Sequence, residues 1–219
     1  MLEVEGLTYR YRSGAGIQDI SFTASGITGV VGRNGAGKTT LFSCLTGHRD
    51  RQAGRILIHG QPCDPRKQPW GWAPTDDYFL EHLTGRQNWE YQSYLKTGKG
   101  DAWKAFSPWI DELELPDVLD RPFREYSTGT RKKVQLINSL VGNPEVLVWD
   151  EPHNGVDLVS NAVLGRLLSS LAEQGRTILL SSHVAEVLQA VCTSLVVLKD
   201  GRVADHLRRP FPADLVPLL

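Results

Sequence analysis

The sequence feature that most constrains the fold of this chain is a glycine-rich segment between a strand-like pattern and a helix-like pattern. Residues Gly32–Thr39 read G-R-N-G-A-G-K-T and match the pattern G-x-x-x-x-G-K-[ST]. The segment follows Ile27–Val31, a short β-branched run typical of a buried strand, and leads into Lys38–Thr46, whose apolar residues have helical spacing. A strand, a glycine turn and a helix in this order predict an α/β fold with an anion site at the turn.

The chemistry of this segment suits a polyphosphate. Glycines allow the backbone to curl so that successive N–H groups point inward, and the helix start adds the positive end of its dipole. Lys38 supplies a point charge for the β- and γ-phosphates, and the Thr39 hydroxyl is a natural Mg²⁺ ligand. The residues expected to contact the nucleotide are Gly32, Asn34, Gly35, Ala36, Gly37, Lys38, Thr39 and Thr40.

Polar groups also follow two other apolar strands. Val146–Trp149 is followed directly by Asp150 and Glu151, and Thr177–Leu180 leads to His183. The carboxyl ends of parallel strands line the ligand crevice, which places Asp150 at the Mg²⁺ and Glu151 at the water that attacks the γ-phosphate. An imidazole there could hydrogen-bond the γ-phosphate or the water, although a structural role for His183 is the alternative from the residues alone.

The middle of the chain has a different pattern from its two ends. Helical patterns at 86–95, 101–113 and 128–141 replace strands there. Strand–helix alternation resumes at 145–149 and continues with the amphipathic segment 158–172. Such alternation predicts a mostly parallel sheet, and we interpret the middle as a helical insertion into an α/β core.

Composition and charge narrow the class of partner. Lys plus Arg is 24 and Asp plus Glu is 25, for a net charge of −1. This balance argues against sequence-independent binding to nucleic acid, and no direct nucleic-acid partner is expected. Apolar runs fall short of the roughly 18–20 residues that span a bilayer, and the first residues do not resemble a secretory signal. Cys44, Cys63 and Cys192 are expected as free thiols in a reducing compartment.

Over essentially its whole length the chain resembles the ATP-binding cassette (ABC) ATPases. The motifs that carry the resemblance are, in order, the phosphate loop, Tyr126–Thr130, Asp150–Pro152, His153–Asp157 and Ser181–His183. The resemblance implies an α/β P-loop NTPase with a RecA-like core, a mostly parallel sheet, N-terminal antiparallel strands and an inserted helical subdomain. It implies a single ATP-binding domain at 1–219, with its core at about 1–72 and 143–219 and its helical subdomain at about 73–142.

The same resemblance assigns roles around the cleft. Lys38 lies in the Walker A loop, Asp150 matches the Walker B acid, Glu151 the catalytic base and His183 the switch histidine. Tyr11 resembles the aromatic residue that stacks on adenine, with Tyr9 as its competitor.

A second set of residues resembles the surface that faces a partner subunit. Ser127, Thr128 and Gly129 resemble the family signature, which binds the γ-phosphate of ATP held by a second subunit, and Asp157 resembles the D-loop aspartate. On spacing alone, a plain helix cap at Ser127 is the alternative.

The chain departs from the family pattern at the Q-loop. Thr75 stands where a glutamine is expected, and its hydroxyl is too short to copy the glutamine's reach. Asp76 is the candidate substitute, either as a metal ligand or as part of the transmission loop, and Asp77 follows it. Thr128 also replaces the first glycine of the signature, at a cost in backbone freedom.

The resemblance implies a machine driven by ATP and Mg²⁺. Its partners are a second nucleotide-binding subunit, in a homodimer or a heterodimer, and a separate transmembrane permease, which places the chain in the cytoplasm at the inner face of the membrane. The compact single cassette resembles exporter subunits more than importer subunits. A soluble ABC ATPase acting on ribosomes or DNA is the alternative, and a non-hydrolysing heterodimer partner is disfavoured because Lys38, Glu151 and His183 are present. The tryptophans that could receive the permease, or instead belong to the core, are Trp70, Trp72, Trp89, Trp103 and Trp109.

Overall fold

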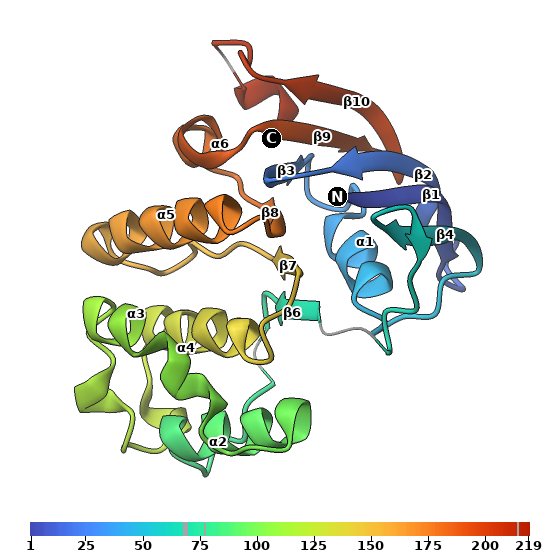
Figure 1. Ribbon diagram of the computed structural model, residues 1–219. Helices are drawn as coiled ribbons and strands as arrows, with labels where there is room; N and C mark the ends of the chain where they lie inside the picture. Colours follow the sequence, from blue (N-terminus) through green and yellow to red (C-terminus); the bar gives the residue numbers. More distant parts are fainter. Residues whose placement is uncertain (68–69, 77, 214) are drawn as a thin grey trace.

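Two sheets and a group of helices make up the computed structural model, which describes residues 1–67, 70–76, 78–213 and 215–219 (Figure 1). The first sheet has the order β2-β1-β4-β5 and is antiparallel. Its strands are β1 (Leu2–Arg10), β2 (Gly16–Ala24), β4 (Ala53–Ile58) and β5 (Gln61–Pro62). These are the antiparallel strands expected near the N-terminus.

The second sheet has the order β10-β9-β3-β8-β7-β6. Its strands are β3 (Ile27–Val31), β6 (Trp70–Ala73), β7 (Val146–Trp149), β8 (Thr177–Ser181), β9 (Ser194–Lys199) and β10 (Arg202–Arg208). All neighbours in it are parallel except β9 and β10, so the predicted mostly parallel sheet is confirmed. Because β3, β7 and β8 run in one direction, the loops that follow them meet at one edge.

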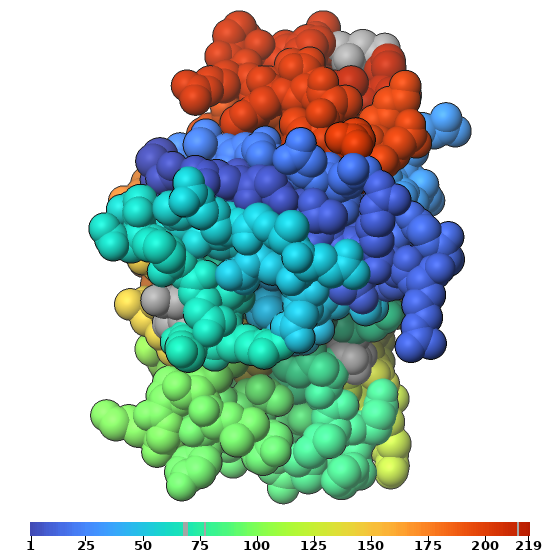
Figure 2. All heavy atoms as spheres, turned by 90° about the vertical axis from the view of Figure 1, so that its right-hand side faces the viewer, coloured from blue at the N-terminus to red at the C-terminus, as the bar shows by residue number. Residues whose placement is uncertain are grey.

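The helices lie on both sides of this second sheet and below it. They are α1 (Lys38–Leu45), α2 (Gly85–Thr97), α3 (Ser107–Glu112), α4 (Thr128–Leu140), α5 (Leu158–Glu173) and α6 (Ala185–Val191), with 3₁₀ turns η1 (Ala102–Phe106), η2 (Pro116–Val118), η3 (Phe123–Glu125) and η4 (Val216–Leu218). Helices α2, α3 and α4 gather at one end of the molecule, away from the antiparallel strands (Figure 1). Figure 2 shows the green segment that contains α2 as a lobe below those strands.

The single helix expected at 101–113 is wrong in detail. The structure has the 3₁₀ turn η1 followed by the short helix α3, with Pro108 in the first turn of α3. Proline has no N–H group to donate to a preceding carbonyl, so it starts a new helix more readily than it continues one.

Alternating side chains of the parallel strands feed two separate cores. Leu147 and Trp149 of β7 pack into the core shared with α4 and α5. Val146 and Val148 of the same strand pack into the other core, which includes α1 and the antiparallel sheet. A strand buried on both faces reads as a continuous apolar run, which is why the sequence showed it so clearly.

The tryptophans belong to the interior. Trp72, Trp89 and Trp103 are buried, while Trp70 and Trp109 are partly buried against the cores. The core alternative for these side chains therefore holds, and they are not an exposed docking surface. The thiols are buried as well, and the structure contains Cys44, Cys63 and Cys192 as free cysteines.

Candidate active site

The phosphate loop occupies the turn from β3 into α1. Gly32 has a φ of 147°, and a Cβ on it would lie 2.3 Å from the main-chain oxygen of Leu198, so the loop passes too close to β9 for a side chain. Gly37 precedes the helix with a φ of 107°, and no side chain caps this helix start. The first N–H groups of α1 are therefore not bonded by a capping side chain, as an anion site requires.

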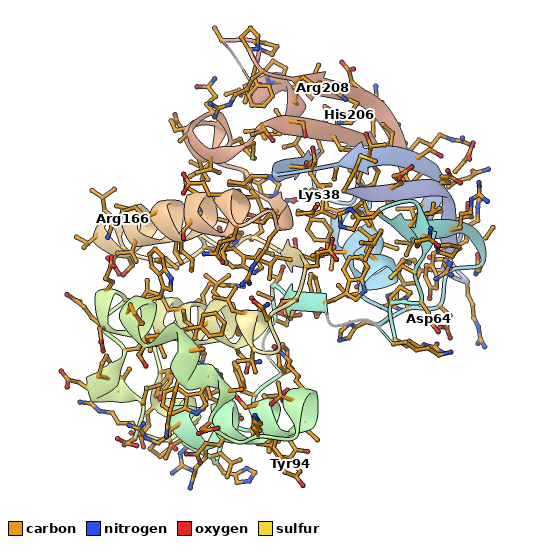
Figure 3. All side chains as sticks on the ribbon, in the orientation of Figure 1. Lys38, Asp64, Tyr94, Arg166, His206 and Arg208 are labelled. Carbon is orange, nitrogen blue, oxygen red and sulfur yellow. The ribbon has the colours of Figure 1, made fainter. Side chains whose placement is uncertain are left out.

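Lys38 is the buried cation of this loop. Its Nζ donates to the carbonyl of Gly32 at 2.6 Å, and only 8% of the residue is exposed. Burial lowers the pKa of its ammonium group, while the carboxylates of Glu151 and Asp150 act in the opposite direction. Figure 3 shows Lys38 near the middle of the molecule, in contrast to Tyr94 at the outer edge of α2.

Asp150 joins the loop to the strand ends. Its Oδ2 accepts from the hydroxyl of Thr39 at 2.8 Å, and its Oδ1 accepts from Ser181 at 2.6 Å. The residue is 2% exposed. Within the described residues no group of three or more His, Cys, Asp and Glu side chains could hold a metal. Mg²⁺ typically takes only one or two protein oxygens, with phosphates and water completing its shell, so the hydroxyl and carboxylate of Thr39 and Asp150 fit this ion.

Glu151 stands next to Asp150 in an unusual backbone conformation. Its φ is 51°, in the left-handed region, and its N–H donates to Ser181 Oγ at 2.9 Å. Its Oε1 lies 3.1 Å from Nε2 of His183. Burial raises the pKa of this carboxyl group, whereas His183 acts to lower it. A buried carboxylate with a raised pKa is a better proton acceptor than an exposed one.

Tyr11 lines the same cleft as this acidic residue. Its hydroxyl is 3.2 Å from Thr40 Oγ1, and Arg49 lies 4.9 Å from its ring centroid. Tyr9 meets Tyr11 edge-on at 5.0 Å, but Tyr11 alone of the two lines the cleft. Between the two competitors, the cleft geometry favours Tyr11 as the platform for a base.

These groups surround one cavity of about 570 Å³, within the usual range for small-ligand sites. Its lining residues are Tyr11, Ala15, Gly16, Asn34, Gly35, Gly37, Lys38, Thr39, Thr40, Thr75, Asp150, Glu151, Asn154 and His183. Three strand ends and the start of α1 thus bring most of the expected nucleotide contacts together.

Other expected contacts lie outside this lining. Ser127 is the N-cap of α4 and accepts from the N–H of Thr130 at 3.2 Å. Asp157 is the N-cap of α5, and its bonds from the N–H and hydroxyl of Ser160 lower its pKa. A Cβ on Gly129 would lie 2.3 Å from the main-chain oxygen of Gly155. The signature segment therefore packs on the loop that joins Glu151 to Asp157, not on the cleft of its own chain.

Three further expected contacts also fall outside the lining. Gly32, the first residue of the loop, is buried, and Ala36 is 7% exposed and packs in the core beside α1. Asp76 is exposed, whereas its neighbour Thr75 lines the cleft. Asp77 lies outside the described residues.

Sequence reasoning missed several residues of the site. Ser181 bonds both Asp150 and Glu151, Asn154 lines the cleft, and Lys132 donates to the carbonyl of Asp150 at 3.4 Å. A serine that ends an apolar strand was a usable signal for Ser181. Lys132 had no such signal, because a lysine in a basic helix normally faces solvent.

This fold and this cleft define a P-loop ATPase. The family model described as ABC transporter matches residues 17–154, more than half of the chain. The chain belongs to the ABC transporter family. A human protein, ATP-binding cassette sub-family A member 2, is 30% identical over 231 residues, which cover 96% of this chain but only 9% of that protein.

Solved structures agree on the fold. A structure described as the ATP-binding subunit of an ABC transporter has a TM-score of 0.83 and 24% identity, covering 95% of this chain and 90% of that one. A dimeric ATP-binding cassette with ADP and phosphate, in a post-hydrolysis state, has a TM-score of 0.78 and 18% identity, covering 96% and 100%. None of the helices within the described residues combines the length and apolar character needed to cross a membrane.

Proposed function

We propose that this chain is the ATP-hydrolysing subunit of an ABC transporter and works as a dimer with a separate transmembrane permease. One observation carries the proposal: Lys38, the Thr39–Asp150 pair and the Glu151–His183 pair converge on a single cleft. The triphosphate would lie over the start of α1, with its negative charge met by Lys38 and by the helix dipole. The base would stack on Tyr11.

Hydrolysis would use the acidic end of the cleft. A water molecule attacks the γ-phosphorus and gives its proton to the carboxylate of Glu151, while the bond from the γ-phosphorus to the bridging oxygen breaks to release ADP and phosphate. His183, close to Glu151, would orient the water or the γ-phosphate. Thr39 and Asp150 would hold Mg²⁺, which neutralises charge on the β- and γ-phosphates when bound.

Dimerisation is supported by the expected nucleotide-contacting residues that lie outside the chain's own cleft. Ser127 and Asp157 are exposed, and beside them Leu158 and Val159 at the start of α5 are 86% and 70% exposed. An apolar pair next to two capped helix ends suits a surface that another copy covers. We propose that this surface closes over the ATP of a second subunit, and that closure and reopening drive transport.

Transport through a permease, and its outward direction, are the finer parts of the proposal. Co-purification from mild-detergent membranes of the source cell tests them. A polytopic membrane protein in fixed ratio with this chain is the expected result, and its fold decides between export and import. Recovery with ribosomes or DNA, and with no membrane protein, would overturn the transporter assignment in favour of the soluble alternative.

A further inference from the structure

The peptide group between Asp150 and Glu151 is held at both of its polar ends. Its N–H, which belongs to Glu151, donates to Ser181 Oγ at 2.9 Å. Its carbonyl, which belongs to Asp150, accepts from Lys132 Nζ at 3.4 Å. The residue that follows this peptide has a φ of 51°, a conformation disfavoured for a residue with a Cβ. Strained conformations of this kind persist only where the surroundings fix them.

Lys132 reaches this peptide from the helical end of the molecule. It lies on α4 and is 5% exposed. The same Nζ donates to the carbonyl of Pro74 at 2.8 Å and to that of Thr75 at 3.3 Å. Pro74 and Thr75 follow β6, and Asp150 follows its parallel neighbour β7. One ammonium group therefore joins the loops after two adjacent strands.

Lys132 acts from behind the cleft and not within it. Thr75 and Asp150 line the cleft, whereas Lys132 does not. Thr75 also occupies the position where a longer glutamine side chain was expected from the sequence. The loop is thus fixed through its main-chain oxygens by a residue of α4, the helix that Ser127 caps and that has Gly129 in its first turn.

We propose that Lys132 is a positioning residue for ATP hydrolysis: together with Ser181 it clamps the Asp150–Glu151 peptide and so keeps the Glu151 carboxylate aimed at the attacking water. The inference rests on the proposed function, because it concerns the same cleft. It adds a mechanical link inside one chain, from the signature helix to the catalytic carboxylate. A shift of α4 would pull directly on the peptide that carries Glu151.

The test separates nucleotide binding from turnover. Lys132→Met removes the three hydrogen-bond donors but keeps a side chain of similar length. We expect its ATP Kd to stay within about threefold of wild type, since the phosphate loop is unchanged, and kcat per ATP-binding site to fall about tenfold or more. Lys132→Arg should recover part of kcat, because a guanidinium can still donate to these carbonyls. A purely structural role would lower the number of binding sites but not kcat per site.

Lys96→Met is the matched control. Lys96 donates to the carbonyl of Asn138 on the same helix α4 at 2.8 Å, but it does not line the cleft. The kcat of Lys96→Met should stay at the wild-type value. A wild-type kcat per site in Lys132→Met would overturn the clamp. If that variant does not fold, Lys132→Gln replaces it, with an intermediate kcat expected and an unchanged kcat contradicting the proposal. Absence of ATP hydrolysis in the wild-type protein would instead overturn the proposed function, and the clamp with it.

Discussion

Helices α1 and α4 both begin at glycine-containing segments, and their surroundings are opposite. Helix α1 begins after Gly37 with no capping side chain, inside a cleft that also holds Lys38, Asp150 and Glu151. Helix α4 begins after Ser127, whose hydroxyl accepts from the N–H of Thr130, at an exposed edge. Both helix starts present the positive end of a helix dipole to an anion. Only the start of α1 also lies beside the carboxylates that hydrolysis of a nucleotide requires.

The difference suggests that these two helix starts, called below the α1 edge (the cleft edge) and the α4 edge (the exposed edge), have different roles toward one nucleotide. In the proposed function, the start of α1 binds and hydrolyses a nucleotide, whereas the start of α4 adds contacts to a phosphate that another copy holds. Their separation within one chain, with exposed Leu158 and Val159 beside the second edge, fits a site completed by another copy. The following changes should therefore affect binding and turnover in different proportions.

Glu151→Gln should have the largest effect. An amide cannot accept the proton of the attacking water, so the rate of phosphate release should fall about 1000-fold while the ATP Kd stays within about threefold. Steady-state phosphate release and equilibrium nucleotide binding measure the two quantities. Glu173→Gln, at the exposed end of α5, is the control and should behave as wild type. Hydrolysis within tenfold of wild type in Glu151→Gln would remove this residue as the base.

Lys38→Ala should act on binding first. Loss of a buried ammonium beside the triphosphate should weaken the ATP Kd about 100-fold, in line with a charge-assisted contact of about 3 kcal/mol. Titration calorimetry measures the affinity. Lys99→Ala, an exposed lysine after α2, should leave it unchanged. Tight ATP binding by Lys38→Ala would contradict the assignment of the phosphate loop.

Gly129→Ala tests the second edge. The new Cβ would lie 2.3 Å from the main-chain oxygen of Gly155, so the start of α4 or the loop must shift, by a backbone change of the kind that costs about 1–3 kcal/mol. We expect turnover to fall about tenfold or more with ATP binding by the cleft unchanged. Gly165→Ala is the matched control, since its Cβ meets nothing within 4 Å. Equal losses in both variants would show a stability effect instead.

Tyr11→Ala should have the smallest effect. Loss of a stacking ring should weaken ATP binding about tenfold. Inorganic tripolyphosphate, which has no base, should bind Tyr11→Ala as it binds wild type. Tyr11→Phe keeps the ring and should retain most of the ATP affinity, and Tyr9→Ala should have no comparable effect. A loss of ATP affinity in Tyr9→Ala but not in Tyr11→Ala would move the base platform to Tyr9.

The cleft edge was far easier to predict from the sequence than the exposed edge. Local patterns predicted Lys38, Asp150 and Glu151, because Asp150 and Glu151 directly follow one buried apolar strand and Lys38 follows the glycine turn after another. The strands themselves were clear because burial on both faces leaves continuous apolar runs. The helix expected at 101–113 was wrong because tertiary packing and Pro108 divide it.

Contacts between segments distant in sequence could not be predicted in this way. Lys132 and Asp150 are 18 positions apart, and nothing local indicates that the lysine turns inward to three carbonyls. The resemblance named Ser127 and Asp157, yet their caps and their exposure follow only from the packed structure. In the proposed dimer, the exposed edge contacts a nucleotide bound by another copy. The sequence and structure of a single chain therefore give only one side of that contact.

The mass of Glu151→Gln in solution, with and without ATP, tests this account most directly. Light scattering should give 24.3 kDa without nucleotide and twice that mass with ATP and Mg²⁺, because the unhydrolysed nucleotide would hold the α1 edge of one copy against the α4 edge of another. The same variant carrying Gly129→Ala should remain at 24.3 kDa under both conditions. A monomeric mass for Glu151→Gln at saturating ATP would contradict the shared site.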